Sequence, residues 1–280
     1  MLNDRGYMRR NPEEDARGGI HAMFGLIVAN LIVFIIQHMM GGADITGKFA
    51  LNTFFIKKYE FWRFFTAMFL HGGFMHFFFN MFGLYIFGSL AAPVLGAKRF
   101  LLLYLLSGTL GNVLWFFVNW NNPYAWLIGA SGAVMGVILA SAMLLPNIPM
   151  MLLFIPFPIK LKTLAVVYII IEVVSQIGNP DSQTSYLAHI FGFICGYFYM
   201  RFFCKEGIEW DPLAALFGKG KKNGLPPGWT DSSAEPGLKT ISREEVERLL
   251  IKLSRQGINA LTEEEQETLR KAREEMMNQR

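Results

Sequence analysis

Six long apolar runs constrain the fold of this chain more than any other feature of its sequence. Each run is close to the roughly 20 mainly apolar residues that a helix needs to cross a bilayer. Because backbone groups in hydrocarbon must be hydrogen-bonded within their own segment, we expect the runs to form helices that pack into a bundle. They extend approximately over Gly19 to Met40, Phe69 to Ala92, Phe100 to Trp120, Gly129 to Leu145, Leu161 to Ile177 and Tyr186 to Cys204.

The composition also favours a membrane protein. Hydrophobic residues make up 52% of the 280 residues and charged residues only 17%, which is more apolar surface than one water-soluble core of this length normally buries. The expected fold class is therefore all-α membrane: a six-transmembrane-helix bundle with a small cytosolic helical hairpin at the C-terminus. We expect a cytosolic N-terminal segment over residues 1–18, the membrane domain over 19–204, a flexible linker over 205–240 and the hairpin over 241–280.

The positions of lysine and arginine predict the orientation of the bundle, because positive charge beside a span is retained on the cytoplasmic side. With both termini in the cytoplasm, the basic residues left outside are Lys48, Lys57, Lys58 and Arg63, all in the first loop. This loop, Gly41 to Thr66, is rich in aromatic residues, so we expect a structured element half-sunk in the membrane interface. Arg63 is expected to fix the loop by pairing with carbonyl groups or lipid phosphates.

Several other classes of protein are disfavoured. The acidic stretch Glu13 to Asp15 before the first run is not typical of a secretory signal, so the first span is expected to remain attached. Cys195 and Cys204 both lie in the last run, which excludes an extracytoplasmic disulfide framework. The isoelectric point of about 9.0 is attributed to the positive cytoplasmic loops, and no nucleic-acid partner is expected because an interleaved basic and aromatic surface is missing.

The composition changes after the last run. Gly218 to Leu238 holds five glycines and three prolines, as a flexible linker would. Ser242 with Glu245, and Thr262 with Glu265, have the spacing of capping boxes that begin two helices. This pair has few apolar residues, so we interpret it as a solvated helical hairpin without chemistry whose partner is unknown.

Strongly polar groups inside spans are costly, which makes each a functional candidate. The second run contains His71, His76 and Asn80, and the last two are four residues apart on one helical face. The fourth run opens with Ser131, and the sixth carries His189 near its start. All of these groups lie near the outer ends of even-numbered runs, which share a direction by alternation, so they are expected to occupy one depth.

Small residues explain how two of these groups could meet. Gly132 and Gly136 in the fourth run, and Gly192 and Gly196 in the sixth, would let the two helix backbones approach closely. Ser131 immediately precedes the first of these pairs, and His189 lies just before the second.

This set of residues is typical of nucleophilic catalysis. A serine hydroxyl is a weak nucleophile until a neighbouring base accepts its proton, and neutral histidine is the commonest such base. Ser131 and His189 supply that pair. The amide of Asn80, the ring N–H of His76 and the backbone N–H of Ser131 are candidate donors to the oxyanion of a tetrahedral intermediate.

Each residue alone also has a structural explanation. A serine beside glycine in a membrane helix is more often a packing residue, and a lone histidine is often a satisfied interhelical hydrogen bond. The nucleophile elbow of soluble hydrolases is excluded, because Gly132 directly follows the serine and the context is helical. The joint occurrence of the set at one depth favours catalysis.

These motifs resemble those of the rhomboid intramembrane proteases over residues 19–204. Family members have Trp-Arg in the first loop, His-x-x-x-Asn on the second span, Gly-x-Ser-Gly opening the fourth, and Ala-His with two spaced glycines on the sixth. The matching residues are Trp62 and Arg63; His76 and Asn80; Gly129, Ser131 and Gly132; and Ala188, His189, Gly192 and Gly196, while His71 also falls where the family often has a histidine.

The resemblance implies a Ser–His dyad without a catalytic aspartate. Such an enzyme would cleave single-pass or polytopic transmembrane protein substrates near the outer membrane face. The expected location is the bacterial inner (cytoplasmic) membrane, with both termini cytosolic. The fifth span and the short loop Gly178 to Ser185 are candidates for a substrate gate, by this resemblance and because lids commonly control access.

One position departs from the family. Family members frequently place a tyrosine one turn after the nucleophile, where it stacks on the catalytic imidazole, and here that residue is Met135. A thioether can contact an aromatic ring favourably, so we predict that Met135 packs against His189. Glu172 in the fifth run is interpreted as cavity-lining or structural.

The sequence disfavours three other functions. A catalytically inactive rhomboid-like protein that binds membrane clients is disfavoured because Ser131, His189, His76 and Asn80 are present together. A transporter or channel is disfavoured because it would be expected to show an ionisable relay or broken helices in matching halves, and the sequence shows neither. A zinc protease lacks support because no His-Glu-x-x-His occurs and neither cysteine lies near the polar cluster, so neither metal nor other cofactor is expected.

Overall fold

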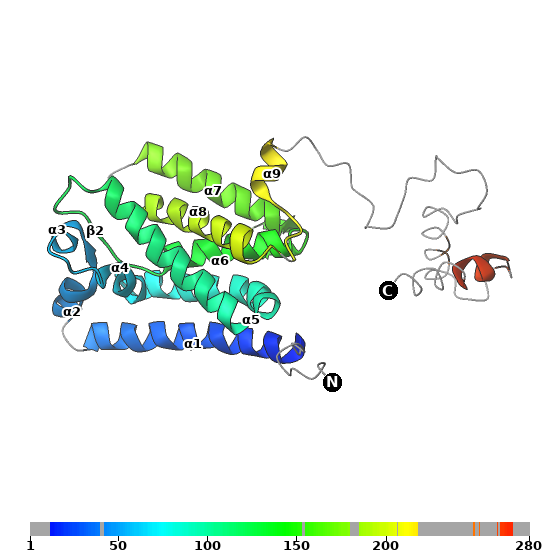
Figure 1. Cartoon of the computed structure of the whole chain (residues 1–280), viewed down its shortest axis with the longest axis horizontal. Helices are drawn as coiled ribbons and strands as arrows, with labels where there is room; N and C mark the ends of the chain where they lie inside the picture. The colour runs from blue at the N-terminus through cyan, green and yellow to red at the C-terminus, as the bar shows by residue number, and fades with distance from the viewer. Residues whose placement is uncertain are drawn as a thin grey trace, which may run out of the picture. The chain divides into compact units, whose positions relative to one another are not determined.

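The computed structural model describes residues 12–39, 42–152, 155–179, 185–205 and 207–217, together with 249, 252, 262 and 264–270. The chain divides into two compact units, Met1–Gly218 and Lys219–Arg280. The first unit is mostly helical (Figure 1). The finer domain boundaries that the sequence suggests within and between these units stay predictions.

All six apolar runs are helical, but they form five continuous elements. These are α1 (Pro12–Met39), α5 (Phe74–Val118), α6 (Ser131–Leu144), α7 (Leu161–Gly178) and α8 (Tyr186–Phe203). Among the described residues, α1, α5 and α7 are long and apolar enough to cross a membrane, and α6 is a shorter apolar helix. Several apolar helices in a mostly helical chain agree with the expected membrane class.

The second and third apolar runs are joined within α5. Gly96 interrupts the helical backbone there, with φ of 72°. This left-handed conformation costs glycine little because it has no Cβ. The break falls in the short segment between the two runs, which ends with Lys98 and Arg99, so α5 consists of two helical halves on either side of Gly96.

The core of this unit is built around α6. Every residue from Gly132 to Leu144 is buried, and α6 packs against α5 and α8. The helix α1 packs on α5, whereas α7 contacts α6 and α8 (Figure 1). Only Leu161, Ala165 and Glu172 of α7 are buried among the described residues, so α7 is the most loosely packed of these helices.

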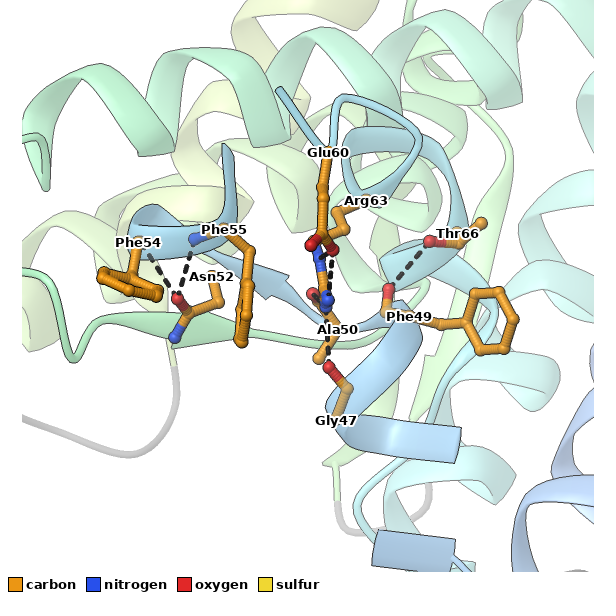
Figure 2. Close-up of polar contacts among 9 residues, drawn as sticks. All are labelled: Gly47, Phe49, Ala50, Asn52, Phe54, Phe55, Glu60, Arg63 and Thr66. Atoms are coloured by element: carbon orange, nitrogen blue, oxygen red, sulfur yellow. Dashed lines mark hydrogen bonds and ion pairs between the residues drawn. The ribbon is translucent and has the colours of Figure 1, made fainter. Parts of the chain in front are cut away.

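The first loop folds into short elements. They are α2 (Gly42–Phe49), β1 (Leu51–Asn52), α3 (Thr53–Ile56), α4 (Arg63–Thr66) and a 3₁₀ helix (Ala67–Phe69). The side chain of Asn52 accepts hydrogen bonds from the backbone N–H groups of Phe54 and Phe55, which caps α3 (Figure 2). The loop is therefore structured, as its composition suggested.

Arg63 binds the centre of this loop (Figure 2). Its Nη1 donates to the carbonyl oxygens of Gly47 and Ala50, each at 2.8 Å, and its Nη2 lies 2.6 Å from Oε2 of Glu60. The guanidinium also lies over the ring of Phe55 at 4.4 Å. The side chain is buried with its charge paired, so Arg63 has the carbonyl-binding role that the sequence suggested, with Glu60 as a further partner.

Short strands occur in the connections and were not part of the all-α expectation. β1 pairs antiparallel with β2 (Trp126–Leu127), and β3 (Pro149–Leu152) pairs antiparallel with β4 (Ile155–Lys160). A final short helix, α9 (Pro212–Phe217), follows α8. Apolar periodicity identifies the long helices. Strands as short as β1 and β2 have two residues each and depend on long-range pairing, which leaves no periodic signal in the sequence.

In the second unit, residues 264–270 are helical. The Thr262 N–H donates to Oε2 of Glu265 and the Glu265 N–H donates to Oγ1 of Thr262, at 2.9 and 3.3 Å. This reciprocal pair confirms the second predicted capping box. The first one, at Ser242 and Glu245, lies outside the described residues, so the predicted hairpin stays a prediction.

Candidate active site

His76 lies in the first turn of α5, and its hydrogen bonding defines its tautomer. Nδ1 accepts a hydrogen bond from the backbone N–H of Gly72 at 3.2 Å. A neutral imidazole with an accepting Nδ1 carries its proton on Nε2. The Nε2 atom lies 2.8 Å from the point that a Cβ on Gly129 would occupy, so the ring N–H is available beside Gly129.

Gly129 lies beside both the His76 ring and the Ser131 hydroxyl. Its missing Cβ would lie 2.8 Å from Nε2 of His76 and 3.7 Å from Oγ of Ser131. Its φ of 127° is also a conformation that residues with side chains rarely adopt. Glycine is thus required both by the backbone and by the space that the Ser131 hydroxyl and the His76 ring share.

The first loop holds the segment that leads into Ser131. β1 pairs with β2, with Leu51 opposite Leu127. The backbone N–H of Gly129 donates to the carbonyl oxygen of Ala67 at 2.9 Å. Because Ser131 is the first residue of α6, these backbone bonds set the position from which its hydroxyl projects.

Glycine contacts bring α6 and α8 to backbone distance. A Cβ at Gly192 would overlap the carbonyl oxygen of Gly132, and one at Gly196 would lie 2.6 Å from the Cα of Gly136. The carbonyl oxygen of Ala188 lies 3.3 Å from the Cβ position of Gly132. The backbone beside Ser131 therefore packs directly on the backbone beside His189, as the glycine spacing suggested.

His189 has a charged partner that the sequence did not reveal. Its Nδ1 lies 2.8 Å from Oε2 of Glu172 on α7. Both side chains are largely enclosed, at 12% exposure for His189 and 7% for Glu172. The signal that could have identified this partner is that Glu172 is the only acidic residue in the six apolar runs, where an ionisable group suggests a functional contact.

Asn80 lies one turn after His76 and is buried. Its amide nitrogen donates to the backbone carbonyl of His76 at 2.7 Å. An asparagine amide has two N–H donors, so this local bond fixes the side chain with the second N–H still available for another acceptor.

His71 is fully buried beside His76. The two rings form an edge contact with centroids 5.2 Å apart, and the His71 backbone N–H donates to Oε1 of Gln37. Within the described part of the chain, neither ring nitrogen of His71 has a hydrogen-bond partner. The ring contact supports the orientation of His76.

The remaining predicted residues have separate positions. Trp62 is half exposed at the start of α4, next to Arg63. Met135 is buried one helical turn after Ser131 and belongs to the core around α6. Its predicted contact with the His189 ring stays a prediction.

Metal ligands do not converge at this site. Within the residues described, no group of three or more histidine, cysteine, aspartate or glutamate side chains could hold a metal ion. The contacts place the Ser131 hydroxyl and the His76 ring beside Gly129, and the Glu172 carboxylate beside the His189 ring. Groups of these kinds are suited to proton transfer and oxyanion binding.

Comparisons with known proteins identify the family of this chain. A family model described as Rhomboid domain matches residues 58–206. The Bacillus subtilis protein YdcA, whose name places it among the rhomboid proteases, is 31% identical over 151 residues, covering 54% of this chain and 70% of YdcA.

Two further relatives match over smaller shares of their own length. The rhomboid protease GluP of Bacillus subtilis is 29% identical over 198 residues, which are 69% of this chain and 36% of GluP. Rhomboid-like protein 11, a chloroplastic protein of Arabidopsis thaliana, is 30% identical over 140 residues, which are 50% of this chain and 46% of the relative. The matched region therefore spans less than half of either relative.

Proposed function

This chain belongs to the rhomboid family and is an integral membrane protein, and from that premise we propose that it is an intramembrane serine endopeptidase. It cleaves transmembrane protein substrates near the outer membrane face, with Ser131 as nucleophile and His189 as general base. One observation carries the proposal: the glycine contact between α6 and α8 brings the backbone beside Ser131 against the backbone beside His189.

The proposed reaction begins with attack of Ser131 Oγ on the carbonyl carbon of the scissile peptide bond. The hydroxyl proton passes to Nε2 of His189. The resulting oxyanion accepts hydrogen bonds from the His76 ring N–H, the free N–H of Asn80 and the backbone N–H of Ser131.

Two steps complete the reaction: collapse of the tetrahedral intermediate and hydrolysis of the ester that it leaves. The C–N bond breaks as His189 returns its proton to the leaving amine, and an ester remains on Ser131. A water molecule, deprotonated by His189, attacks this ester. The carboxyl product leaves and the Ser131 hydroxyl recovers its proton, so serine and histidine return to their starting states.

Substrate must reach this site in an extended conformation, because a hydrogen-bonded helix shields its carbonyl groups from a nucleophile. We propose that α7 and the following loop, Gly178 to Ser185, form the gate through which it enters. The weak burial of α7 supports this role. Positions 180–184 of the loop lie outside the described residues.

The proposed topology has six spans, α5 contributing two of them on either side of Gly96, with both termini in the cytoplasm of a bacterial cell. Basic residues after the even-numbered runs and around Lys98 support this orientation. The C-terminal helices are then a cytosolic module.

The test is cleavage of a model transmembrane substrate by purified protein in liposomes. We expect the wild type to cut the substrate, and Ser131→Ala and His189→Ala to lose detectable cutting. Ser89→Ala is the matched control, because this half-buried serine donates a hydrogen bond to the local backbone carbonyl of Ile86 at 2.8 Å. Cleavage that persists in Ser131→Ala would contradict the proposal, and a well-folded wild type that binds the substrate without cutting it would favour an inactive client-binding protein.

A further inference from the structure

The imidazole of His189 has two nitrogen atoms with different tasks. The Nε2 atom must be free of hydrogen to accept the Ser131 proton, which requires the neutral ring to carry its proton on Nδ1. In the structure Nδ1 lies 2.8 Å from Oε2 of Glu172. An ionised carboxylate only accepts hydrogen bonds, so this contact selects the tautomer that proton transfer requires.

The same carboxylate lies where charge develops during the reaction. When His189 accepts the serine proton it becomes an imidazolium, and a negative group at 2.8 Å favours that state. With 7% side-chain exposure for Glu172, solvent screens this interaction weakly. With Ser131 as the proposed nucleophile, the groups would have the order found in soluble serine hydrolases: nucleophile, imidazole and carboxylate.

Two features of the helices place Glu172 for this role. It is the only buried residue in the second half of α7 among those described, although an isolated carboxylate would be expected to avoid burial in an apolar helix. The residue that family resemblance expects to support the imidazole from α6, a tyrosine, is Met135 in this chain. A thioether can pack against the ring but is only a weak hydrogen-bond acceptor, so the acceptor for Nδ1 comes from another helix, where Glu172 Oε2 lies 2.8 Å away.

We propose that Glu172 is a positioning residue that orients and polarises His189, so that this chain works with a Ser–His–Glu arrangement rather than a dyad. The inference rests on the proposed protease function. In this inference a residue of α7 affects the chemical step by acting through the His189 ring.

A purely structural alternative is a latch that ties α7 to α8. A latch would alter substrate access and stability, whereas a positioning residue alters proton transfer. The two roles therefore differ in which constant changes: KM and thermal stability for a latch, and kcat for a positioning residue.

The experiment compares wild type, Glu172→Gln, Glu172→Asp and the control Ser89→Ala, which lies in α5, in liposomes with a model transmembrane substrate. We expect Glu172→Gln to lower kcat roughly 10- to 100-fold, as the loss of a hydrogen bond to a charged partner would. KM should change by less than about twofold, because the interaction strengthens in the transition state. Glu172→Asp should recover part of kcat, and Ser89→Ala should behave as wild type.

Reactivity of Ser131 in the absence of substrate separates the two roles. A fluorophosphonate probe applied to the same variants measures this reactivity without substrate docking. A positioning role predicts that Glu172→Gln labels roughly 10- to 100-fold more slowly than wild type, in parallel with its lower kcat, whereas a latch that acts on substrate access predicts wild-type labelling.

The outcomes are distinguishable. Unchanged kcat in Glu172→Gln, or a raised KM with wild-type probe labelling, overturns the inference and leaves the protease intact. If Glu172→Gln is unfolded, the Glu172→Asp variant decides: a stable Glu172→Asp protein with a raised KM and wild-type probe labelling supports only the latch and overturns the inference. A wild type that neither cleaves nor labels overturns the protease function and this inference with it.

Discussion

Gly192 of α8 packs directly on the backbone of Gly132 in α6, so closely that a Cβ at position 192 would overlap the Gly132 carbonyl oxygen. This contact sits one turn from His189 and next to Ser131. Helix association in lipid depends on such close packing, because apolar helices gain nothing from leaving a solvent that is itself apolar. The separation of the two helices is therefore set by glycine, and the proposed proton transfer from Ser131 to His189 depends on that separation.

The first prediction concerns this contact. Gly192→Ala should force α6 and α8 apart, lowering the apparent Tm and abolishing cleavage, since overpacking costs about 1–3 kcal/mol or more when the obstacle is backbone. Gly25→Ala is the matched control, because no residue in the described part of the chain, other than its near neighbours in the helix, lies within 4 Å of the Cβ position at Gly25. Equal thermal stability and equal cleavage rates for the two variants would show that the glycine contact does not position the site.

A second prediction separates oxyanion binding from local structure. Asn80→Ala should lower kcat by about 10²- to 10³-fold with little change in KM, as expected for a donor used in the transition state. Asn119→Ala is its control, since Asn119 donates to the carbonyl four residues earlier at 2.9 Å, just as Asn80 does at 2.7 Å. Steady-state kinetics of both variants in liposomes provide the comparison. A kcat in Asn80→Ala equal to that in Asn119→Ala would remove Asn80 from the oxyanion site.

Part of this arrangement could be predicted from the sequence. Local periodicity along the sequence is enough to recognise the six apolar runs, the polar residues within them and the spacing of the glycines. The pairing of Glu172 with His189 could not be predicted, because it depends on how α7 is rotated against α8. α7 has no stripe of small residues that would show in the sequence which of its faces packs. Only the structure shows that the face carrying Glu172 is the buried one.

The first loop gives a similar lesson. Its charge and aromatic content indicated a structured element, and Arg63 was assigned to carbonyl groups. The specific carbonyls, at Gly47 and Ala50, and the β1–β2 pairing that joins the loop to the segment before Ser131 are long-range contacts. Turn and strand propensities of two-residue elements carry too little signal to predict them.

A third prediction tests the structural role of Arg63. Arg63→Lys should loosen the first loop, because lysine lacks the planar fork that serves two carbonyls and a carboxylate at once. Each lost hydrogen bond to the charge is worth about 1.5–3 kcal/mol. Hydrogen–deuterium exchange of residues 44–66 should accelerate, while Arg17→Lys, at an ion pair with 73% exposure of the arginine side chain, should leave exchange unchanged. Protection equal to wild type in Arg63→Lys would exclude this role.

A fourth prediction addresses Met135. Met135→Ala and Met143→Ala both delete a buried side chain of α6, so both should lose stability by about 2–5 kcal/mol. If Met135 packs on the His189 ring, only Met135→Ala should also lower kcat at a temperature where both variants are folded. Indistinguishable kcat values for the two variants would contradict the predicted contact and leave Met135 as a core residue.

The most direct measurement of the central claim is the site at which a fluorophosphonate probe attaches. The account predicts a covalent adduct on Ser131 in the wild-type protein, located by mass spectrometry of the peptide that carries it, and strongly reduced labelling in His189→Ala. Such an adduct requires a serine activated by a neighbouring base. A protein that cleaves its substrate while Ser131 remains unmodified, or one labelled equally well without His189, would contradict the assignment of Ser131 and His189 as nucleophile and base.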